Sequence, residues 1–553
     1  MSSVLKRIFN RIKKDDGKII LDDNTHIKIV KETSKLIPLP RAHLVPTSAR
    51  EDYLSNIRVV KESYPLVTTN LNNVKHIVAS AHISFNPLVN QLTYNLYEPQ
   101  LDNNLRDLVE KTLTELHNRL EVGLNHLGAK KEVYNYVDQK IDEIWTELKV
   151  NISDTDTIKA KYFIFRDTVG LGKIEALMRD PNLEDISCDG IGLPVFIFHR
   201  NPLYGELPTN ISFDSKDELD SFVMKLAQKT GRTVSVASPL LDAALPDGSR
   251  IQITYGTDIA RKGSNFSIRK FFKVPMTAAD LVGYGTADPM MLAYLWLAIE
   301  EQQSILVAGT TAVGKTTFLN AIAEFIYPTM KIVSIEDTPE LQLMHTNWTP
   351  QVARNGFGPK KYGEISMFDL LKASMRQRPD YIIVGEVRGV EANVLFQAMA
   401  TGHPSLSTLH ADNINAVIDR LTTRPINLPM SLLENLDIIV FMEKVKMRGR
   451  FSRKVGQVLE IENYDRETKK LNTNEAFNWD SVNDIFIAHN SYVLTKIAKR
   501  QGWTMKQVHD ELLRRANVIR WLQQKKVSGF RNVSNAIRMY YSNPIELAKQ
   551  MEG

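Results

Sequence analysis

The segment 305–319, ILVAGTTAVGKTTFL, constrains the fold more than any other part of this 553-residue chain. Gly309, four further residues and then Gly314, Lys315 and Thr316 form the P-loop pattern, with an apolar run before it and the helix-like TTFLNAIAEFI after it. Such a loop turns backbone N–H groups towards phosphates, and the dipole of the following helix favours negative charge. The segment therefore predicts a nucleotide site between a strand and a helix.

Two residues of the loop carry chemistry of their own. We expect the Lys315 ammonium to reach the β- and γ-phosphates and the Thr316 hydroxyl to bind Mg²⁺. A nucleoside triphosphate and Mg²⁺ are therefore the predicted cofactors. The residues expected to touch the nucleotide are Gly309, Thr310, Thr311, Ala312, Val313, Gly314, Lys315, Thr316 and Thr317.

Three apolar runs downstream of the loop each end in polar residues. KIVSIEDTPE ends at Glu336 and Asp337, YIIVGEVRG ends at Glu386, and SLSTLHAD ends at Thr408 and His410. Because ligands of a parallel sheet lie beyond the carboxyl ends of its strands, these side chains are predicted to converge on the γ-phosphate. The strand with Glu336 comes between the P-loop and the strand with Glu386 in the sequence, which favours a RecA-type core.

Each of these side chains has a predicted role. Glu336 can orient the attacking water and accept its proton, while Glu386 can hold Mg²⁺ directly or through water, although the aspartate usual in a Walker B strand is absent there. The two glutamates could exchange these roles, and either could instead be a solvated carboxylate at a strand end. His410 is expected to sense the γ-phosphate or to be structural. His403 is likewise expected to sense the γ-phosphate or to be a buried structural residue. A metal site at the two histidines is disfavoured because no cysteine accompanies them.

Three regions are predicted along the chain, and the fold class is α/β. Residues 1–155 are a mixed, partly helical region, with a helix over 105–120 and more helix to 150. Residues 156–275 form a smaller α/β domain, in which KYFIFRD, PVFIFHR and RIQITYG are β-rich runs and DELDSFVMKLAQKTG is a helix closed by Gly231. Residues 276–553 alternate strands and helices and end, from 490, in helices.

Composition and charge narrow the function classes. The 69 basic and 64 acidic residues leave a net charge of +5, which permits a membrane surface or a polyanion as partner but does not indicate nucleic acid. The single cysteine, Cys188, excludes an internal disulfide framework and a multi-cysteine zinc site, as expected for a reducing cytoplasm.

No apolar run reaches the roughly 18 residues that a membrane-spanning helix needs. The start, MSSVLKRIFNRIKK, places Leu5, Ile8, Phe9 and Ile12 at helical spacing among basic residues, which predicts a membrane- or partner-binding helix or else a frayed terminus.

Four motifs together resemble those of a known family. GTTAVGKTT, SIEDTPEL, RQRPDYIIVGEVRG and TGHPSLSTLHAD, in this order and spacing, are similar to the motifs of the type II/type IV secretion ATPases. The similarity covers residues 160–553. It implies ATP as the nucleotide and a RecA-like motor core with a helical C-terminal extension. It also implies a smaller PAS-like α/β domain before the core, matched by DPNLEDISCDG and GRTVSVASPLLDAALPDGSRIQIT.

The resemblance further implies that arginines outside the motor core reach the nucleotide. The matching positions are Arg250 in DGSRI and Arg269 in FSIRK, with Arg232 as a weaker candidate. An arginine brought to the γ-phosphate by domain closure can raise the hydrolysis rate by about 10³ to 10⁵, and it would couple closure to hydrolysis. The alternative is that these are surface arginines in solvated ion pairs.

Within the family, the chain resembles archaeal members. It lacks the cysteines for the four-cysteine zinc module usual in bacterial type II secretion and pilus-extension members, and its ending, RRANVIRWLQQKKVSGFRNVSNAIRMYYSNP, is similar to archaeal sequences. The archaellum motor ATPase is the first expectation, and an archaeal adhesion-pilus or secretion ATPase is the second. The resemblance implies a homo-hexamer, cytoplasmic and peripheral at the inner face of the cell membrane. Its expected partners are a polytopic membrane platform protein and accessory cytoplasmic archaellum proteins.

Two other classes of protein share a P-loop core. A nucleotide-dependent scaffold would bind ATP and hardly hydrolyse it, but it would not need a water-orienting carboxylate such as Glu336 beside Glu386. A nucleic-acid translocase would bind with a steep salt dependence and carry a dense basic stripe, which the sequence does not show. An ATPase is therefore the predicted enzyme class.

Overall fold

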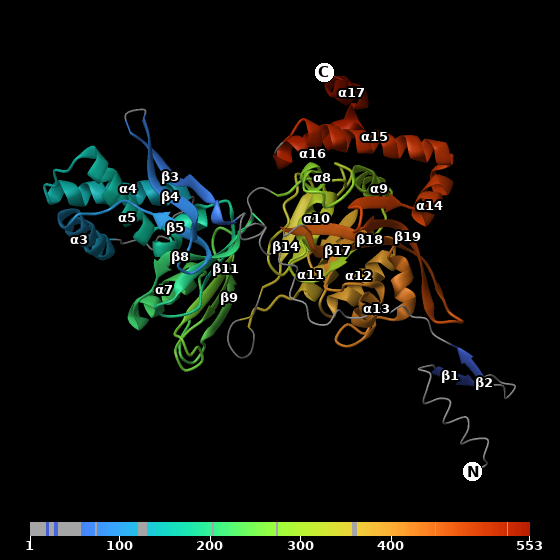
Figure 1. The fold of residues 1–553 in the computed structure, drawn as a ribbon, viewed down its shortest axis with the longest axis horizontal. Coiled ribbons are helices and arrows are strands. Elements are labelled where there is room, and N and C mark those ends of the chain that lie inside the picture. The colour runs from blue at the N-terminus through green and yellow to red at the C-terminus, as the bar shows by residue number, and fades with distance from the viewer. Residues whose placement is uncertain are drawn as a thin grey trace, which may run out of the picture. The chain divides into compact units, whose positions relative to one another are not determined.

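The computed structural model shows a mixed α/β chain (Figure 1). It describes residues 18–21, 27–30, 57–71, 74–119, 130–201, 204–271, 275–354, 356, 362–447, 450–527 and 529–552. The chain divides into two compact units, residues 1–54 and residues 55–553. In the first unit, β1 (Lys18–Leu21) pairs antiparallel with β2 (Ile27–Val30). The predicted basic helix over residues 5–12 lies outside the described residues.

The first nine-stranded sheet belongs to the N-terminal half of the second unit. Its strands lie in the order β3-β4-β5-β8-β7-β6-β11-β10-β9. Their bounds are β3 (Lys61–Leu71), β4 (Val74–Asn86), β5 (Gln91–Tyr97), β6 (Leu183–Cys188), β7 (Pro194–His199), β8 (Gly205–Ser212), β9 (Leu240–Ala244), β10 (Arg250–Thr254) and β11 (Asn265–Arg269). One sheet thus joins strands on both sides of the predicted boundary at 155, and that boundary stays a prediction.

Helices and one 3-10 turn accompany this sheet. They are α3 (Asn103–Arg119), α4 (Lys130–Glu147), α5 (Asp154–Thr168), η2 (Gly172–Ile174), α6 (Glu175–Arg179) and α7 (Lys216–Lys229). The predicted helix that ends at Gly231 is confirmed as α7. It begins at Ser215, whose hydroxyl accepts a hydrogen bond from the Glu218 N–H, and Gly231 follows it at a φ of 74°, a conformation that favours glycine.

One of the predicted β-rich runs is wrong. KYFIFRD, residues 161–167, lies in α5. Ser153 starts this helix by accepting a hydrogen bond from the Asp156 N–H, and Ala160 and Ile164, four residues apart, are buried in a cluster with residues of α3 and α4. Aromatic content therefore suggested a strand where the burial pattern has the period of a helix. The runs in PVFIFHR and RIQITYG are confirmed as β7 and β10.

The second nine-stranded sheet forms the region for which the sequence predicts a RecA-like motor core. Its strands lie in the order β14-β13-β15-β16-β12-β17-β18-β19-β20. Their bounds are β12 (Ile305–Gly309), β13 (Ile332–Glu336), β14 (Trp348–Val352), β15 (Tyr381–Val384), β16 (Ser405–Leu409), β17 (Ile438–Met447), β18 (Arg450–Asp465), β19 (Lys470–Asp480) and β20 (Ile485–Ala488). Neighbours are parallel from β14 to β17 and antiparallel from β17 to β20. Because β16 lies between the P-loop strand β12 and β15, the sheet has the RecA-like arrangement that the sequence predicts.

Helices cover both faces of this sheet. They are α8 (Ala278–Gly283), α9 (Pro289–Glu300), α10 (Lys315–Ala323), α11 (Met367–Ser374), η3 (Met375–Gln377), α12 (Glu391–Ala400), α13 (Ile414–Thr422), η4 (Met430–Asn435), α14 (Tyr492–Gln501), α15 (Met505–Gln524), α16 (Phe530–Ser542) and α17 (Pro544–Glu552). Ile305 and Val307 belong to a hydrophobic cluster with α8 to α10 and the C-terminal helices, whereas Leu306 and Ala308 belong to one with α11 to α13. A strand buried on both faces must be apolar along its length, which explains the run that precedes the P-loop.

The predicted helical ending of the chain is confirmed by α14 to α17. Across the described ranges, no helix combines the length and the apolar character that crossing a bilayer requires.

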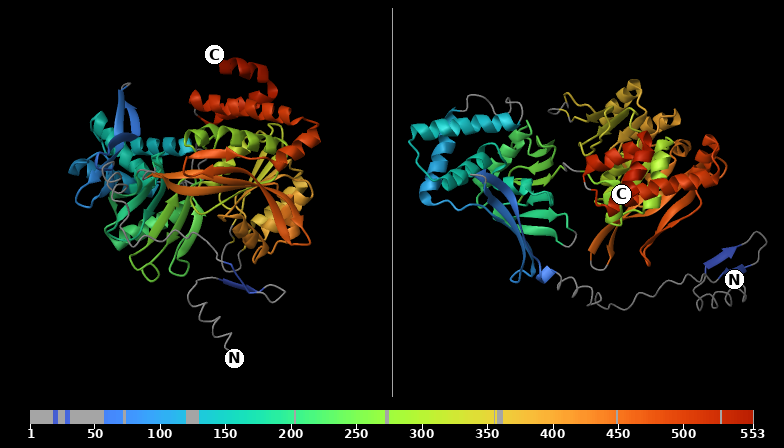
Figure 2. Two further views of the ribbon diagram at one scale, coloured as in Figure 1. Left: turned by 45° about the vertical axis from the view of Figure 1, so that its right-hand side comes forward. Right: turned by 90° about the horizontal axis from the view of Figure 1, so that it is seen from above.

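A buried arginine joins the C-terminal helices to the motor core. Arg515 on α15 is 2% exposed and pairs with Glu300 at the end of α9 and with Glu511 one turn before it. Its guanidinium also lies over the rings of Trp296 and Tyr540, at 5.1 and 5.3 Å from their centroids. The red helices α15 and α16 thus lie against the green helices α8 and α9 (Figure 2) around an ion pair that is largely shielded from water.

Replacing this arginine should loosen the C-terminal helices. Arg515→Met removes the cation that pairs with Glu300 and the buried one of the two arginines that pair with Glu511, so we expect the free energy of opening α15 to fall by roughly 3 kcal/mol. Native-state hydrogen exchange of the α9 and α15 amides measures this loss. Arg514→Met is the control, because the Arg514 side chain is 63% exposed and its surface pair with Glu511 is worth at most about 1 kcal/mol. Equal losses in the two variants would contradict the anchoring role.

Candidate nucleotide site

The P-loop connects β12 to α10. Gly314 is the N-cap of α10 at a φ of 88°, which favours glycine, and a Cβ on Gly309 would lie 2.5 Å from the carbonyl oxygen of Met442 on β17. Ala312 in the loop also has a positive φ, of 63°. No side chain caps α10, so the first backbone N–H groups of this helix are left for an anion. The loop therefore has the geometry of a phosphate cradle that opens beside Lys315.

Lys315 begins a chain of polar contacts that joins three strand ends. Its ammonium donates to the Thr310 carbonyl oxygen at 2.8 Å and lies 3.3 Å from His410 Nδ1. His410 Nε2 lies 3.2 Å from Glu386 Oε1, and Thr311 Oγ1 lies 3.5 Å from His410 Nδ1. Since β12, β16 and β15 are parallel neighbours, their carboxyl ends meet at one edge of the sheet. The structure therefore brings Lys315, His410 and Glu386 together.

Sequence reasoning missed two arginines of this cluster. Arg388 donates to Glu386 at 2.6 Å and lies 4.0 Å from Asp337. Arg420 on α13 donates to the carbonyl oxygen of His410 at 2.7 Å. The contact of Arg388 could have been predicted from its position two residues after Glu386, because both residues follow the end of the same strand. Nothing in the sequence near Arg420 indicates its contact.

A third missed arginine comes from the hairpin of β17 and β18. Arg453 Nε donates to the Ala312 carbonyl oxygen of the P-loop at 3.2 Å. A Cβ on Gly314 would lie 3.4 Å from Arg453 Cδ, so this arginine also packs against the start of α10. In the strand register Arg453 is paired with Lys444, which places two cations side by side on this hairpin. The long sequence separation between hairpin and loop hides the contact.

The environment of this cluster shifts the pKa values of its members. Burial lowers the pKa of Lys315 to about 8, although the charge of Glu386 acts in the opposite direction. Burial would raise the pKa of Glu386, but the hydrogen bond from Arg388 and the charges of Arg388, His410 and Lys315 outweigh it, so that pKa is lowered. Burial and the charge of Lys315 lower the pKa of His410. At neutral pH, Glu386 is therefore ionised and His410 is neutral.

Glu336 lies outside this chain of contacts. It is 2% exposed at the end of β13, and its Oε1 accepts hydrogen bonds from the backbone N–H groups of Glu340 and Leu341 at 2.9 and 3.0 Å. It remains close to the strand end that carries Glu386, because a Cβ on Gly385 would lie 3.0 Å from Glu336 Cγ. Burial raises the pKa of Glu336 to about 7, against these two hydrogen bonds. The two predicted glutamates therefore have different environments, and only Glu386 is held firmly ionised.

His403 is at the wrong end of β16 to share the role of His410. It precedes the strand, whereas His410 follows it, and its Nδ1 lies 3.3 Å from Thr401 Oγ1. His403 is half-buried in this turn. Of the two predicted histidines, only His410 contacts Lys315.

The predicted arginines lie on the first sheet. Arg250 on β10 donates to Asp242 at 2.6 Å, and Arg269 on β11 donates to Asp185 at 3.2 Å. The two are direct partners in the ladder of β10 and β11. Arg232 donates to the carbonyl oxygen of Asp242. Among the residues that the structure describes, neither Arg250 nor Arg269 is hydrogen-bonded to the P-loop, and their delivery to a nucleotide stays a prediction.

The residues at the start of α10 fit Mg²⁺ in the company of phosphate. This ion usually keeps several waters and binds through one or two protein oxygens together with phosphate oxygens. Thr316 is half-buried in the first turn of α10, and Glu386 supplies an ionised carboxylate. Within the described part of the chain, no three His, Cys, Asp or Glu side chains are grouped so as to hold a metal without such help.

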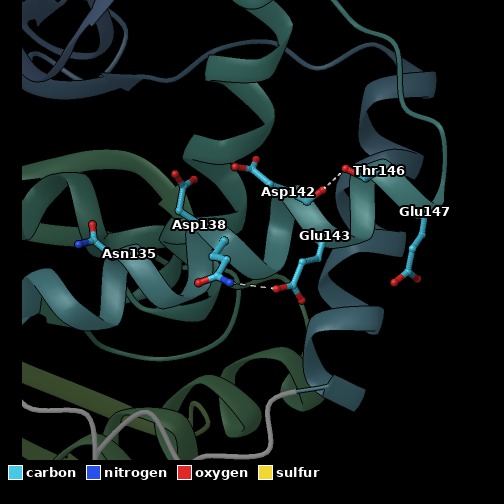
Figure 3. Close-up of a pocket in the computed structure, with 7 residues that line it drawn as sticks. Asn135, Asp138, Asp142, Glu143, Thr146 and Glu147 are labelled. Atoms are coloured by element: carbon cyan, nitrogen blue, oxygen red, sulfur yellow. Dashed lines mark hydrogen bonds between the residues drawn. The ribbon is translucent and has the colours of Figure 1, made fainter.

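A surface hollow on α4 is a poor alternative site for a nucleotide (Figure 3). It is lined by Asn135, Asp138, Gln139, Asp142, Glu143, Thr146 and Glu147. Among the described residues, the cations at this hollow already pair with its carboxylates: Lys161 with Asp138 and Asp142, Lys140 with Glu143, and Arg119 with Glu147. The remaining negative charge repels phosphates. The P-loop cluster is therefore the candidate nucleotide site.

Comparison with known proteins identifies the family. Residues 195–458 match the family model described as type II/IV secretion system protein, and residues 482–553 match a PilB3-like C-terminal model. An uncharacterised protein of Methanocaldococcus jannaschii is 40% identical over 445 residues, which are 79% of this chain and 78% of that protein.

More distant relatives match a smaller share of the chain. The type IV secretion system protein PtlH homolog of Bordetella bronchiseptica is 32% identical over 278 residues, 43% of this chain and 80% of that protein. The crystal structure of the pilus retraction motor PilT with bound ADP is 18% identical and covers 64% of this chain and 92% of its own, with a TM-score of 0.36 that is too low for comparing details. From the family match and these relatives, the chain belongs to the type II/IV secretion system protein family.

Proposed function

We propose that this chain is an Mg²⁺-dependent ATPase, the hexameric motor that powers assembly of the archaellum, a type IV pilus-like surface filament, and its rotation. The observation that carries the proposal is the chain of contacts from Lys315 through His410 to Glu386 beside the P-loop. A protein that only binds a nucleotide needs the phosphate cradle, but not the carboxylates Glu386 and Glu336 on neighbouring strand ends. Membership of the secretion family supports the motor role.

Each residue of the site has a separate role in the proposed ATP hydrolysis. The backbone N–H groups of the P-loop and Lys315 hold the β- and γ-phosphates. Mg²⁺, when held by Thr316 and Glu386, supplies positive charge that offsets the charge on the phosphate oxygens. Glu336 accepts the proton of the attacking water, since a general base works best when its pKa is close to the working pH. His410, neutral and in contact with Lys315, is the proposed sensor of the γ-phosphate.

Partners and location follow from the family and stay part of the proposal. We propose a ring of six copies at the cytoplasmic face of the cell membrane, working on a polytopic platform protein together with accessory cytoplasmic proteins. Arg250 and Arg269 would reach the nucleotide when the first-sheet domain closes on the motor core. Arg250 would then have to leave Asp242, and Arg269 would have to leave Asp185, before either could bind a phosphate. Domain closure would therefore be coupled to the opening of these two ion pairs.

Assembly of an archaeal adhesion pilus, or type II-like secretion, is the second candidate. The match of residues 482–553 to a PilB3-like model favours it, whereas the archaellum assignment rests on sequence resemblance. The residues of the candidate site serve all three machines equally. A gene deletion, rather than the geometry of the site, distinguishes the archaellum, the adhesion pilus and type II-like secretion.

Lys315→Ala should lower steady-state phosphate release by roughly a hundredfold or more, because it removes a positive partner of the transferred phosphate. Its circular dichroism spectrum should match that of the wild type. Lys372→Ala on α11 is the matched control, since Lys372 is exposed and outside the P-loop cluster, and it should keep the rate. Collapse of the spectrum in Lys315→Ala would show that the lysine is structural. Absence of phosphate release from the wild type would leave only the scaffold interpretation.

The pH dependence of hydrolysis distinguishes the two glutamates. If Glu336 is the base it must be deprotonated, so kcat/KM should rise through about pH 7 and fall above about pH 8 as Lys315 loses its proton. Glu340→Gln removes a negative charge that raises the pKa of Glu336, so the rising limb should move to lower pH. A profile with no rising limb between about pH 6 and 8 would assign the base to Glu386, whose pKa is lowered.

Deletion of the gene in the source organism should abolish swimming filaments and leave adhesive pili in place. Electron microscopy of cell surfaces, with motility scored in parallel, measures both. Loss of adhesive pili alone would move the assignment to the second candidate. Normal filaments of both kinds would contradict the filament-motor proposal.

A further inference from the structure

Residues 340–345, named here the 340–345 loop, follow the carboxylate that we propose as the base. Oε1 of Glu336 accepts hydrogen bonds from the backbone N–H groups of Glu340 and Leu341 at 2.9 and 3.0 Å. One carboxylate oxygen thus carries both bonds. A shift of the 340–345 loop must therefore either drag the Glu336 carboxylate along or release it.

The P-loop helix α10 holds the middle of this loop. Asn320 Oδ1 accepts a hydrogen bond from the Gln342 N–H at 2.8 Å, and Glu324 Oε1 accepts one from the Met344 N–H at 3.1 Å. Asn320 and Glu324 are 4% and 5% exposed, and they lie one turn apart at the end of the helix that starts with Lys315. The loop is therefore tied to the element whose first turn forms the phosphate cradle.

The C-terminal helix α16 holds the same loop at the same residue. Arg538 of α16 donates through Nη2 to the carbonyl oxygen of Met344. Met344 thus has its N–H bonded to α10 and its C=O bonded to α16. Ile537 of α16 and Leu343 of the loop are both buried and belong to the same large hydrophobic cluster. Met344 therefore connects α16 with the nucleotide helix α10, in addition to the bond that Tyr541 of α16 donates to the Phe325 carbonyl oxygen at 3.3 Å.

We propose that Arg538 is a positioning residue for hydrolysis, which holds Met344 and thereby keeps the 340–345 loop and the Glu336 carboxylate in place against α10. The C-terminal helices then control the hydrolysis rate through the placement of α16. A partner bound to these helices can change the rate without touching the nucleotide. This inference rests on the proposed ATPase function and on Glu336 as the base.

Other contacts anchor α16 to the motor core, so the role of Arg538 can be tested separately. Trp296 Nε1 donates to Tyr541 Oη at 2.6 Å, and Tyr541 Oη donates to the Phe325 carbonyl oxygen at 3.3 Å. These contacts do not involve Met344. Loss of the Arg538 side chain should therefore leave α16 docked while it frees one side of the 340–345 loop.

The test compares kcat and KM for ATP in the full chain with Arg538→Met, Arg538→Lys and, as a matched control on the same helix, Arg531→Met. Arg538→Met should lower kcat on the order of tenfold to a hundredfold and leave KM unchanged, because the base is displaced and the phosphate cradle is not. Arg538→Lys can still donate to Met344 and should recover most of the rate. Arg531 is exposed, and its replacement should change neither constant.

Three outcomes overturn the inference: an unchanged kcat in Arg538→Met, a change in KM alone, or an equal loss in Arg538→Lys. If Arg538→Met does not fold, Glu324→Met and Glu324→Gln take its place, because glutamine can still accept the hydrogen bond from Met344. Loss of kcat in Glu324→Met alone supports the inference, and equal values in the two variants contradict it. An inactive wild-type chain would overturn the proposed function and this inference together, whereas an active wild type with a fully active Arg538→Met overturns this inference alone.

Discussion

Burial of four parallel strands on both faces determines where the chemistry of this chain can lie. Every residue of β12, β13, β15 and β16 is buried. Side chains that meet a ligand must therefore lie at the strand ends, and the parallel direction puts all the carboxyl ends at one edge. Lys315, Glu386 and His410 meet there, although long stretches of chain separate them. Each of the four motifs named above includes the carboxyl end of one of these strands.

The same packing explains why the nucleotide site is connected to the C-terminal helices. The P-loop helix α10 lies in one hydrophobic cluster with α9, α15 and α16. Two arginines of this region contribute in different ways. Arg515 fixes the helices to the core through buried ion pairs, while Arg538 donates to the Met344 carbonyl oxygen within the 340–345 loop. On the proposed function, mutation of Arg515 and mutation of Arg538 should separate stability from control of hydrolysis.

Much of the fold could be predicted from the sequence, because strands buried on both faces must be continuous apolar runs, as in YIIV of β15. The prediction failed at KYFIFRD, where aromatic residues fill an amphipathic helix, and it did not foresee that residues 61–97 join the sheet of 183–269. Within the site, residues next to strand ends were predictable. The contacts of Arg420 and Arg453 were not, since they depend on how a helix and a hairpin pack after the chain has folded.

The differing states of the two glutamates were equally hidden, since sequence alone treats Glu336 and Glu386 as equivalent carboxylates at strand ends. The structure separates them, because backbone N–H groups of the 340–345 loop and burial surround one, while Arg388 and His410 surround the other. An experimental structure of the full chain with Mg²⁺ and a non-hydrolysable ATP analogue would show whether these side chains meet at one phosphate. We predict Lys315 on the γ-phosphate, Thr316 and Glu386 at Mg²⁺, and Glu336 facing the attacking water. A γ-phosphate with both glutamates out of reach would contradict the account.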